Sequence, residues 1–331
     1  MSWHQLMLAG EGDAWRPETI DKAVQLASAL GAELELFQCV FEPAAARSGR
    51  LTPRHVSGVI RSIVRRVHQK LETQAEVVRS RGLRVRTSVR WDRPPADGIV
   101  RQVLRRSPDL VLFEAARKRP GAHWIHRRTD FRLIERCPRP VLLIKNARLY
   151  NGRCTLAAVD PARAHDKPLA LDDAVLRAAA TISGALAREQ QAFHACVPWP
   201  EKARELLELR SAPEEVYAEA RSAYLRDVED RVRELARRHG ILDAHVHVEE
   251  GAAPELLPRL VRNTAADIVV VGAVARSLWK RTWVGHTAER ILDALDCDLL
   301  VVKPPGFRVA VPPQSVHRID RAQALPGRYI W

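Results

Sequence analysis

The fold is decided by a stretch near the end of the chain that begins Asp267-Ile-Val-Val-Val-Gly272 and closes Cys297-Asp-Leu-Leu-Val-Val-Lys303. Between these apolar runs stand Arg276 and the segment Gly285-His286-Thr287-Ala288-Glu289-Arg290. The pattern predicts a strand, a glycine-bearing loop, a helix and a second strand. That order places backbone N–H groups at the start of a helix, where an anion or a phosphate is stabilised.

A weaker copy of the flanking strands lies in the first half of the chain. Pro108-Asp-Leu-Val-Leu-Phe-Glu114 corresponds to the first apolar run, and Ile134-Glu-Arg-Cys-Pro-Arg-Pro-Val-Leu-Leu-Ile-Lys145 corresponds to the last. The earlier copy lacks the glycine loop. The sequence therefore predicts one duplicated fold with one candidate site.

Strand-like and helix-like runs alternate in both halves. In the first half we expect strands at 5–9, 33–40, 83–90, 109–113 and 141–145, with helices at 18–30, 52–81, 96–106 and 129–135. In the second half we expect strands at 154–160, 191–197, 244–249, 267–271 and 298–303, with helices at 169–188, 212–239, 254–263 and 287–295. Strands separated by helices predict an α/β fold with a five-stranded, parallel, doubly wound sheet in each half.

The length of 331 residues favours two domains. The boundary is expected near 146–153, a short polar stretch that contains Asn151-Gly152. We therefore predict domains at 1–148 and 149–303. Residues 304–331 begin with Pro304-Pro305-Gly306 and are expected to form an extended tail.

The excess of positive over negative charge lies in the first half. Residues 1–150 carry 28 lysines and arginines against 15 acidic residues, and the remainder carries 25 of each, so the first half holds the whole net charge of +13. One interpretation is a surface that attracts nucleic acid or anionic lipid, and the other is an ordinary arginine-rich soluble surface. On helix 52–81, Arg54, Arg61 and Arg65 share a face opposite the apolar residues. No nucleic-acid motif accompanies them, so nucleic acid is not the expected partner.

The sequence gives no sign of membrane insertion or secretion. No apolar run approaches the roughly 18 residues of a membrane helix, and the N-terminus lacks the pattern of a signal peptide. The five cysteines have no metal-type or disulfide-type spacing and mostly lie in apolar runs. We expect reduced, buried thiols, a cytoplasmic location and no membrane partner.

These features resemble the universal stress protein family in its tandem-domain, E-type form. The loop from Gly272 to Gly285 has the family length, Arg276 stands at the family arginine, and Val159-Asp160-Pro161 matches its strand-terminal aspartate. The resemblance implies two adenine-nucleotide alpha-hydrolase-like domains that pair within one chain as a pseudo-dimer. It also leaves room for a homodimer of the whole chain.

The resemblance also implies a ligand site in the second half. In ATP-binding members the aspartate and a valine backbone hold adenine and ribose, while the glycine loop and a Ser/Thr hold phosphate. The corresponding positions here are Asp160, Val197, Gly272, Arg276, Gly285, His286 and Thr287. Two positions depart from the pattern, because Ala275 replaces the second glycine and His286 stands at the Ser/Thr position.

The first half departs further from the family pattern. Gly10 is assigned to the place of the aspartate, with Glu11 next, and Glu114 follows the fourth strand. A glutamate there repels phosphate, although the basic residues that follow would offset it. These are Arg117, Lys118 and Arg119. We therefore expect no nucleotide site in the first half.

Several candidate residues have a structural alternative. Asp160 is either a ribose ligand or a cap for the following helix, and Arg276 is either an anion contact or a solvated arginine. Thr287 suits a helix N-terminus in either case.

The histidines give no sign of catalysis or of a metal site. His286 has no nucleophile or base near it in sequence. His245 and His247 are expected on one strand face, but two ligands do not by themselves define a zinc site. Trp279 and Trp283 either wall an apolar pocket or pack on the other domain.

The prediction is a non-catalytic stress-response protein that binds a small ligand, with ATP as the cofactor candidate, in its C-terminal domain. The first alternative is a non-nucleotide, apolar ligand in the same pocket. The second is an arginine-rich adaptor for nucleic acid or anionic surfaces. Slow ATP hydrolysis ranks last.

Overall fold

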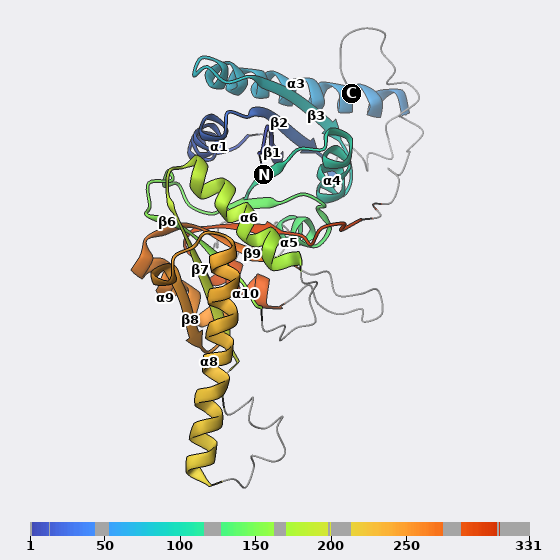
Figure 1. Cartoon of the computed structure of the whole chain (residues 1–331). Helices are drawn as coiled ribbons and strands as arrows, with labels where there is room; N and C mark the ends of the chain where they lie inside the picture. The colour runs from blue at the N-terminus through green and yellow to red at the C-terminus, as the bar shows by residue number, and fades with distance from the viewer. Residues whose placement is uncertain are drawn as a thin grey trace. The chain divides into compact units, whose positions relative to one another are not determined.

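The computed structural model of the chain describes residues 2–12, 14–43, 53–115, 127–161, 170–197, 199, 213–273, 286–309 and 311, and gives only the backbone of 53, 127, 128 and 286–289. Two compact units follow one another along the chain, Ser2–Leu149 and Tyr150–Phe307 (Figure 1). Of the predicted tail, only 304–309 and 311 are among the described residues. Its start turns at Pro304, whose carbonyl oxygen accepts a hydrogen bond of 3.1 Å from Phe307 N–H.

The N-terminal unit contains a parallel sheet with helices between its strands. Its described strands are β1 (Gln5–Glu11), β2 (Glu33–Val40), β3 (Val85–Trp91), β4 (Leu110–Glu114) and β5 (Val141–Ile144). They lie in the order β3-β2-β1-β4-β5, and every neighbouring pair is parallel. The helices are α1 (Pro17–Leu30), α3 (Pro53–Arg79), α4 (Pro95–Arg106) and α5 (Arg127–Arg136).

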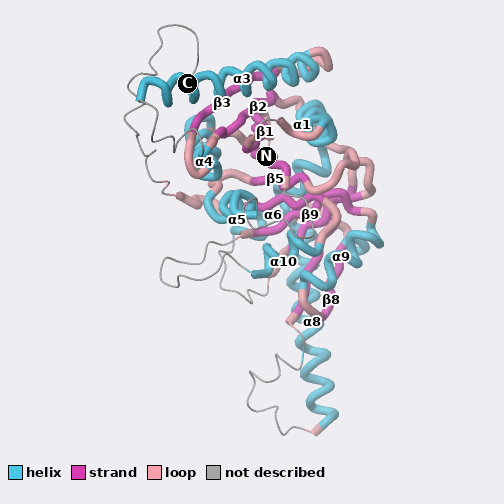
Figure 2. Tube along the Cα trace, turned by 180° about the vertical axis from the view of Figure 1, so that it is seen from behind, coloured by secondary structure: helices cyan, strands magenta, loops and turns pink. Residues whose placement is uncertain are grey.

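The C-terminal unit repeats this arrangement. Its described strands are β6 (Cys154–Ala158), β7 (Glu189–Cys196), β8 (Val246–Glu250), β9 (Ala266–Gly272) and β10 (Asp298–Val302). Their order is β10-β9-β6-β7-β8, again with parallel pairs. The helices are α6 (Ala170–Ala185), α8 (Glu214–Arg238), α9 (Ala253–Thr264) and α10 (His286–Ala294). The predicted tandem α/β fold is confirmed, and Figure 2 separates its strands from its helices by colour.

Local sequence explains why the elements begin and end where they do. Pro17 occupies the first turn of α1, where its missing N–H costs nothing. Gly31 follows the helix with φ of 62°, a left-handed conformation that glycine adopts without a steric penalty. The inner strands are continuous apolar runs, and Leu8 in β1 and Val269 in β9 are fully buried. Both sheets therefore carry the two-sided burial typical of parallel strands.

The structure corrects the start of β8. β8 was expected from residue 244, but Asp243–His245 form a 3₁₀ turn and β8 begins at Val246. His245 and His247 therefore do not share a strand face. Instead, His247 Nε2 lies 2.9 Å from Gln191 Oε1, and His245 lies outside the strand with Nε2 3.7 Å from Glu189.

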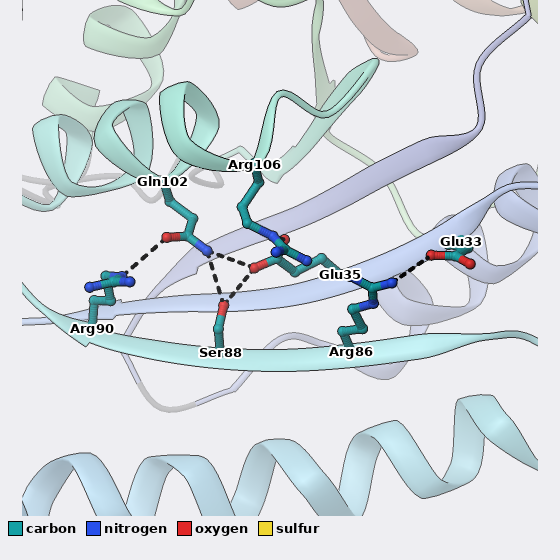
Figure 3. A network of polar contacts seen from close by, with 7 residues as sticks. All are labelled: Glu33, Glu35, Arg86, Ser88, Arg90, Gln102 and Arg106. Atoms are coloured by element: carbon teal, nitrogen blue, oxygen red, sulfur yellow. Dashed lines mark hydrogen bonds and ion pairs between the residues drawn. The ribbon is translucent and has the colours of Figure 1, made fainter. Parts of the chain in front are cut away.

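A polar network joins α4 to β2 and β3 in the N-terminal unit (Figure 3). At its centre Glu35 Oε1 accepts hydrogen bonds from Ser88 Oγ at 2.6 Å and Gln102 Nε2 at 2.7 Å. Arg106 Nε donates to the other oxygen at 3.2 Å, and Arg90 Nε donates to Gln102 Oε1 at 3.1 Å. The Glu35 side chain is only 11% exposed. Its charge is tolerated because it is fully hydrogen-bonded.

The predicted amphipathic character of α3 is confirmed. Arg54, Arg61 and Arg65 are exposed, while Ile60 and Val67 are buried against the sheet. No carboxylate pairs with these three arginines among the described residues. The basic face is therefore open to solvent.

The cysteines are buried and free, as predicted. Burial, together with the charge of Glu250, raises the pKa of Cys196 to about 11, and burial also raises the pKa of Cys154. These thiols are protonated at neutral pH and are therefore poor nucleophiles. None of the described helices combines the length and apolarity needed to cross a membrane.

Candidate functional site

The predicted site residues of the C-terminal unit gather at one edge of its sheet. Asp160 follows β6, Val197 follows β7, and Gly272 ends β9. These strands are neighbours with β6 in the middle. Open α/β sheets bind ligands beyond the carboxyl ends of their strands. The structure thus brings these three residues to the expected edge.

Asp160 presents an unused acceptor at this edge. Its backbone N–H donates to Asp172 Oδ1 at 3.0 Å, but its own Oδ1 atom is buried and has no hydrogen-bond partner among the described residues. The Nδ1 atom of His194 is 3.9 Å from this oxygen and only 2.9 Å from the carbonyl oxygen of Val159. Asp160 caps no described helix. A buried oxygen left in this state favours a donor from beyond the described residues.

The backbone of Val197 is held by α8. Tyr224 donates its hydroxyl to the Val197 carbonyl oxygen at 3.2 Å. Trp199 packs against the same helix, with ring centroids 5.6 Å from Tyr217 and 5.5 Å from Tyr224. Trp199 is buried, and its Nε1 atom has no partner among the described residues. Sequence reasoning missed this aromatic cluster, although two tyrosines seven residues apart on one helix were a usable signal.

Glu250 fixes the turn that carries Trp199. Its carboxylate accepts hydrogen bonds from Trp199 N–H and from Arg221 Nη2, the latter at 2.7 Å. These two bonds, in that order, lower the pKa of Glu250 below 4.5. The turn beyond β7 is thus held most firmly when Glu250 is ionised.

Gly272 leaves space that a neighbouring side chain uses. A Cβ atom at this position would lie 2.7 Å from Cδ2 of Leu171, in the first turn of α6. The absent side chain therefore permits close packing of α6 on the end of β9. This packing explains the glycine without any ligand, and it stands beside the phosphate role that the resemblance implies.

The remaining predicted residues are placed only in part. α10 begins at His286, one residue before the start expected at Thr287, and only the backbone of these two residues is described. Arg276, Gly285 and the loop residues between Ala273 and α10 lie outside the described residues, as do Trp279 and Trp283. A helix that follows a parallel strand starts at the carboxyl end of that strand. The first turn of α10 therefore belongs to the same edge as Gly272.

The two sheets can be matched residue by residue. Asp109, just before β4, accepts backbone hydrogen bonds at the start of β1, from residues 4 and 5. Asp267, near the start of β9, accepts one from Gly152 just before β6. The strand after each aspartate pairs in the same register with the first strand of its unit. The match therefore rests on contacts as well as on sequence.

At matched positions the two carboxyl edges carry different residues. Glu11 stands at the place of Asp160, and Glu114 stands at the place of Gly272. The assignment of Gly10 to the aspartate position is therefore wrong by one residue, because β1 continues to Glu11.

Both glutamates of the N-terminal edge are engaged by the protein. Glu114 Oε2 accepts from Arg16 N–H at 3.2 Å and from Thr19 Oγ1 at 2.7 Å, and Glu114 Oε1 forms an ion pair with Arg16 Nε. Glu11 Oε2 accepts from Thr129 Oγ1 at 2.8 Å. The expected partners of Glu114, Arg117 to Arg119, lie outside the described residues. Arg16, which sequence reasoning missed, takes that role.

The described groups at the C-terminal edge are suited to binding a ligand. A carboxylate accepts hydrogen bonds from hydroxyl groups, and free N–H groups at a helix start attract an anion. The described residues hold no group of three or more histidine, cysteine, aspartate or glutamate side chains suited to a metal ion.

Comparison with known proteins agrees with this architecture. Residues 153–303 match the model of the universal stress protein family. The chain is 27% identical over 292 residues to universal stress protein E of Escherichia coli K12, covering 88% of this chain and 90% of that protein. It is 24% identical over 230 residues to a homologue of that protein in Haemophilus influenzae, covering 67% and 71%.

A solved structure shows the same fold over nearly the whole chain. A putative universal stress protein from Pseudomonas aeruginosa UCBPP-PA14 superposes with a TM-score of 0.66 at 24% identity, covering 92% of this chain and 94% of that one. Similarity over both halves, with a family match in the second, confirms the resemblance seen in the sequence. Residues 153–303 thus match the universal stress protein family, and over both halves the chain is similar to the tandem-domain E-type proteins.

Proposed function

We propose that this protein serves the stress response by binding a small ligand, without turnover, at the carboxyl edge of its C-terminal unit. The first candidate ligand is ATP or another adenine nucleotide. The observation that carries the proposal is the buried Oδ1 atom of Asp160, which lacks a partner among the described residues. At the matched place in the N-terminal unit, Glu11 already accepts a hydrogen bond from Thr129.

A nucleotide suits the groups at this edge. Ribose hydroxyls would donate to Asp160. The base would approach the chain after β7, where Tyr224 already bonds the Val197 carbonyl oxygen, so the Val197 N–H is the group left for the base. Phosphates would take the start of α10, where the helix favours negative charge. The residues we assign to the phosphate end are Gly272, Arg276, Gly285, His286 and Thr287.

Thermal unfolding of the full chain with Mg²⁺ and ATP tests the proposal. At a nucleotide concentration ten times Kd, binding stabilises the fold by about 1.4 kcal/mol. For a unit of this size we expect Tm to rise by roughly 3–5 °C. The Asp160→Ala variant should lose the rise. Asp227→Ala is the matched control, because Asp227 is exposed on α8 and its ion pair among the described residues is with Arg231 at the surface.

Deoxynucleotides sharpen the test of Asp160. If its carboxylate accepts from ribose, 2′-deoxy-ATP or 3′-deoxy-ATP should stabilise the wild type less than ATP does. The two analogues should act equally on Asp160→Ala. No rise in Tm with ATP in the wild type, or a rise that survives Asp160→Ala, would contradict the proposed site.

An apolar ligand is the second candidate, and the Trp199 cluster favours it. The aromatic rings of Trp199, Tyr217 and Tyr224 lie just beyond Val197. Native mass spectrometry of the purified full chain would show a retained ligand as added mass. We expect Trp199→Ala to abolish such a species and Asp160→Ala to leave it. Loss in Asp160→Ala alone would instead support a polar ligand.

Absence of turnover is part of the proposal. Phosphate release from ATP that scales with protein concentration and disappears in Asp160→Ala would contradict it. The pairing of the two halves, a homodimer of the chain and the cytoplasmic location are proposals that rest on the family resemblance. Gel filtration of the full chain tests the homodimer.

A further inference from the structure

The geometry points to an oxyanion site in the N-terminal unit whose resident ligand is the chain's own Glu114 carboxylate. Three groups converge on this carboxylate from the start of α1, namely the Arg16 N–H, the Arg16 guanidinium and the Thr19 hydroxyl. Free carboxylates and phosphates are bound by the same set of donors. We call these three donor groups of Arg16 and Thr19 the cradle. The protein supplies from β4 the anion that the cradle would otherwise bind from solution.

The cradle is built by α1 and holds more donors than Glu114 uses. Arg16 is the N-cap residue of a 14-residue helix, with no side-chain cap of its own, and Thr19 lies in the first turn. The guanidinium nitrogens Nη1 and Nη2 of Arg16 are buried, and neither has a hydrogen-bond partner among the described residues. The site therefore has positive charge and hydrogen-bond capacity beyond one carboxylate.

The comparison between the units indicates that Glu114 acts as the bound anion and is not part of the framework that the two units share. Its matched residue is Gly272, which has no side chain. The β1–β4 framework is otherwise conserved in geometry as β6–β9, with the same parallel pairing. A side chain added at this one position reaches across to the helix that follows the neighbouring strand.

A second carboxylate at the same edge, that of Glu11, is also bonded to the start of a helix. Glu11, at the end of β1, reaches Thr129 in the first turn of α5. Thr129 precedes β5 by the spacing that separates Thr287 from the matched residue of β10. Thr129 therefore occupies the place of a residue that the family resemblance assigns to phosphate. The first turns of α1 and α5 thus each hold a carboxylate from the strand beside the one that their helix follows.

Two consequences follow. A free nucleotide would have to displace two carboxylates and approach their charge, so the wild-type N-terminal unit binds none. When the Glu114 side chain is removed, the cradle should accept a small carboxylate from solution. This inference concerns the N-terminal unit alone and is independent of nucleotide binding in the C-terminal unit.

Chemical rescue tests the inference on the full chain. Glu114→Gly leaves the cradle empty, and its Tm should fall below that of the wild type. Sodium acetate should restore part of the loss in a saturable manner, whereas sodium chloride at equal ionic strength should not. Acetate effects on the wild type and on Glu76→Ala, a control at an exposed α3 glutamate, give the background to be subtracted.

Two further variants define the site. Glu114→Gln fills the space without charge and should show no rescue. Thr19→Val combined with Glu114→Gly removes one donor and should weaken the acetate response. If Glu114→Gly does not fold in chloride, the yields of refolding in acetate and in chloride provide the comparison. Equal acetate effects on Glu114→Gly and the wild type, or equal refolding yields, would overturn the inference.

Discussion

The two units build the same parallel sheet and differ at its carboxyl edge. In the N-terminal unit Glu114 and Glu11 are bonded to the first turns of α1 and α5. In the C-terminal unit the matched residues are Gly272, without a side chain, and Asp160, whose Oδ1 has no described partner. The sheet interior is fixed by apolar packing, whereas the edge is free to change because its polar groups need only some partner. The two copies have therefore kept the same sheet but differ in the polar residues at its carboxyl edge.

The two units also differ in the polar contacts between their second and third strands. In the N-terminal sheet Glu35 bonds Ser88 across β2 and β3. The matched pair in the C-terminal sheet is Gln191 and His247, across β7 and β8. One unit thus uses a charged, arginine-supported network where the other uses neutral groups.

The largest expected effect is the loss of this charged network. Glu35→Ala should lower the free energy of unfolding by about 3–5 kcal/mol, because it leaves Arg106 and the Gln102 amide without their buried acceptor. Gln191→Ala breaks the matched neutral contact and should cost about 1–3 kcal/mol. Urea denaturation of the full chain measures both. Equal losses would show that the charge difference between the units carries no extra energy.

Adding one methyl group at Gly272 should have the next largest effect on stability. Gly272→Ala places a Cβ 2.7 Å from Leu171 Cδ2 and should destabilise by about 1–3 kcal/mol through overpacking. The Leu171→Ala background should relieve the clash, so a double-mutant cycle should show coupling. Gly184→Ala is the control, since no atom lies within 4 Å of its added Cβ. An additive cycle would contradict the packing role of Gly272.

A smaller effect should distinguish the units by pH. Burial lowers the pKa of His247 below 6.5, with the charge of Glu249 opposing the shift. Protons therefore bind the unfolded chain more readily, and the stability that His247 contributes above pH 6.5 is lost as pH falls through the lowered pKa. Its counterpart Ser88 does not titrate. His247→Gln should flatten the dependence of Tm between about pH 7 and pH 5; an unchanged profile would exclude His247 as its source.

The smallest effect is expected on the basic face of α3. Arg61→Gln and Arg65→Gln remove exposed charges without described partners and should change stability by at most about 0.5 kcal/mol. In the C-terminal unit Arg233 pairs with Glu229 on α8, and Arg233→Gln should cost slightly more. Thermal unfolding measures these differences. DNA binding whose salt dependence drops by about one unit per arginine removed would support the adaptor alternative.

Much of the fold was predictable because its signals are local. The strand expected at 33–40 agrees with β2, and the helix expected at 18–30 differs from α1 by one residue. The start of β8 was predicted two residues too early, because Asp243–His245 form a 3₁₀ turn before the strand. Gly10 was misplaced for a related reason, since strand length and register depend on the neighbouring strands.

The site was predictable only as a location. The family resemblance assigned Asp160, Val197 and Gly272 to one site, and the strand order of the structure brings them to one edge of the sheet. The spacing of Tyr217 and Tyr224 signalled only one side of the Trp199 cluster. Its contact with Trp199, like the contact between Gly272 and Leu171, joins segments that only packing brings together.

The sequence by itself determined two copies of a parallel α/β unit and the edge at which a ligand site belongs, because apolar periodicity and turn residues act over a few neighbours. Only the tertiary structure decided which edge is already filled. Arg16 and Glu114 are 98 residues apart in sequence, and Glu11 and Thr129 are 118 apart. Hydrogen bonds of this kind depend on distance in space, which the chain acquires only when the sheet aligns its strands.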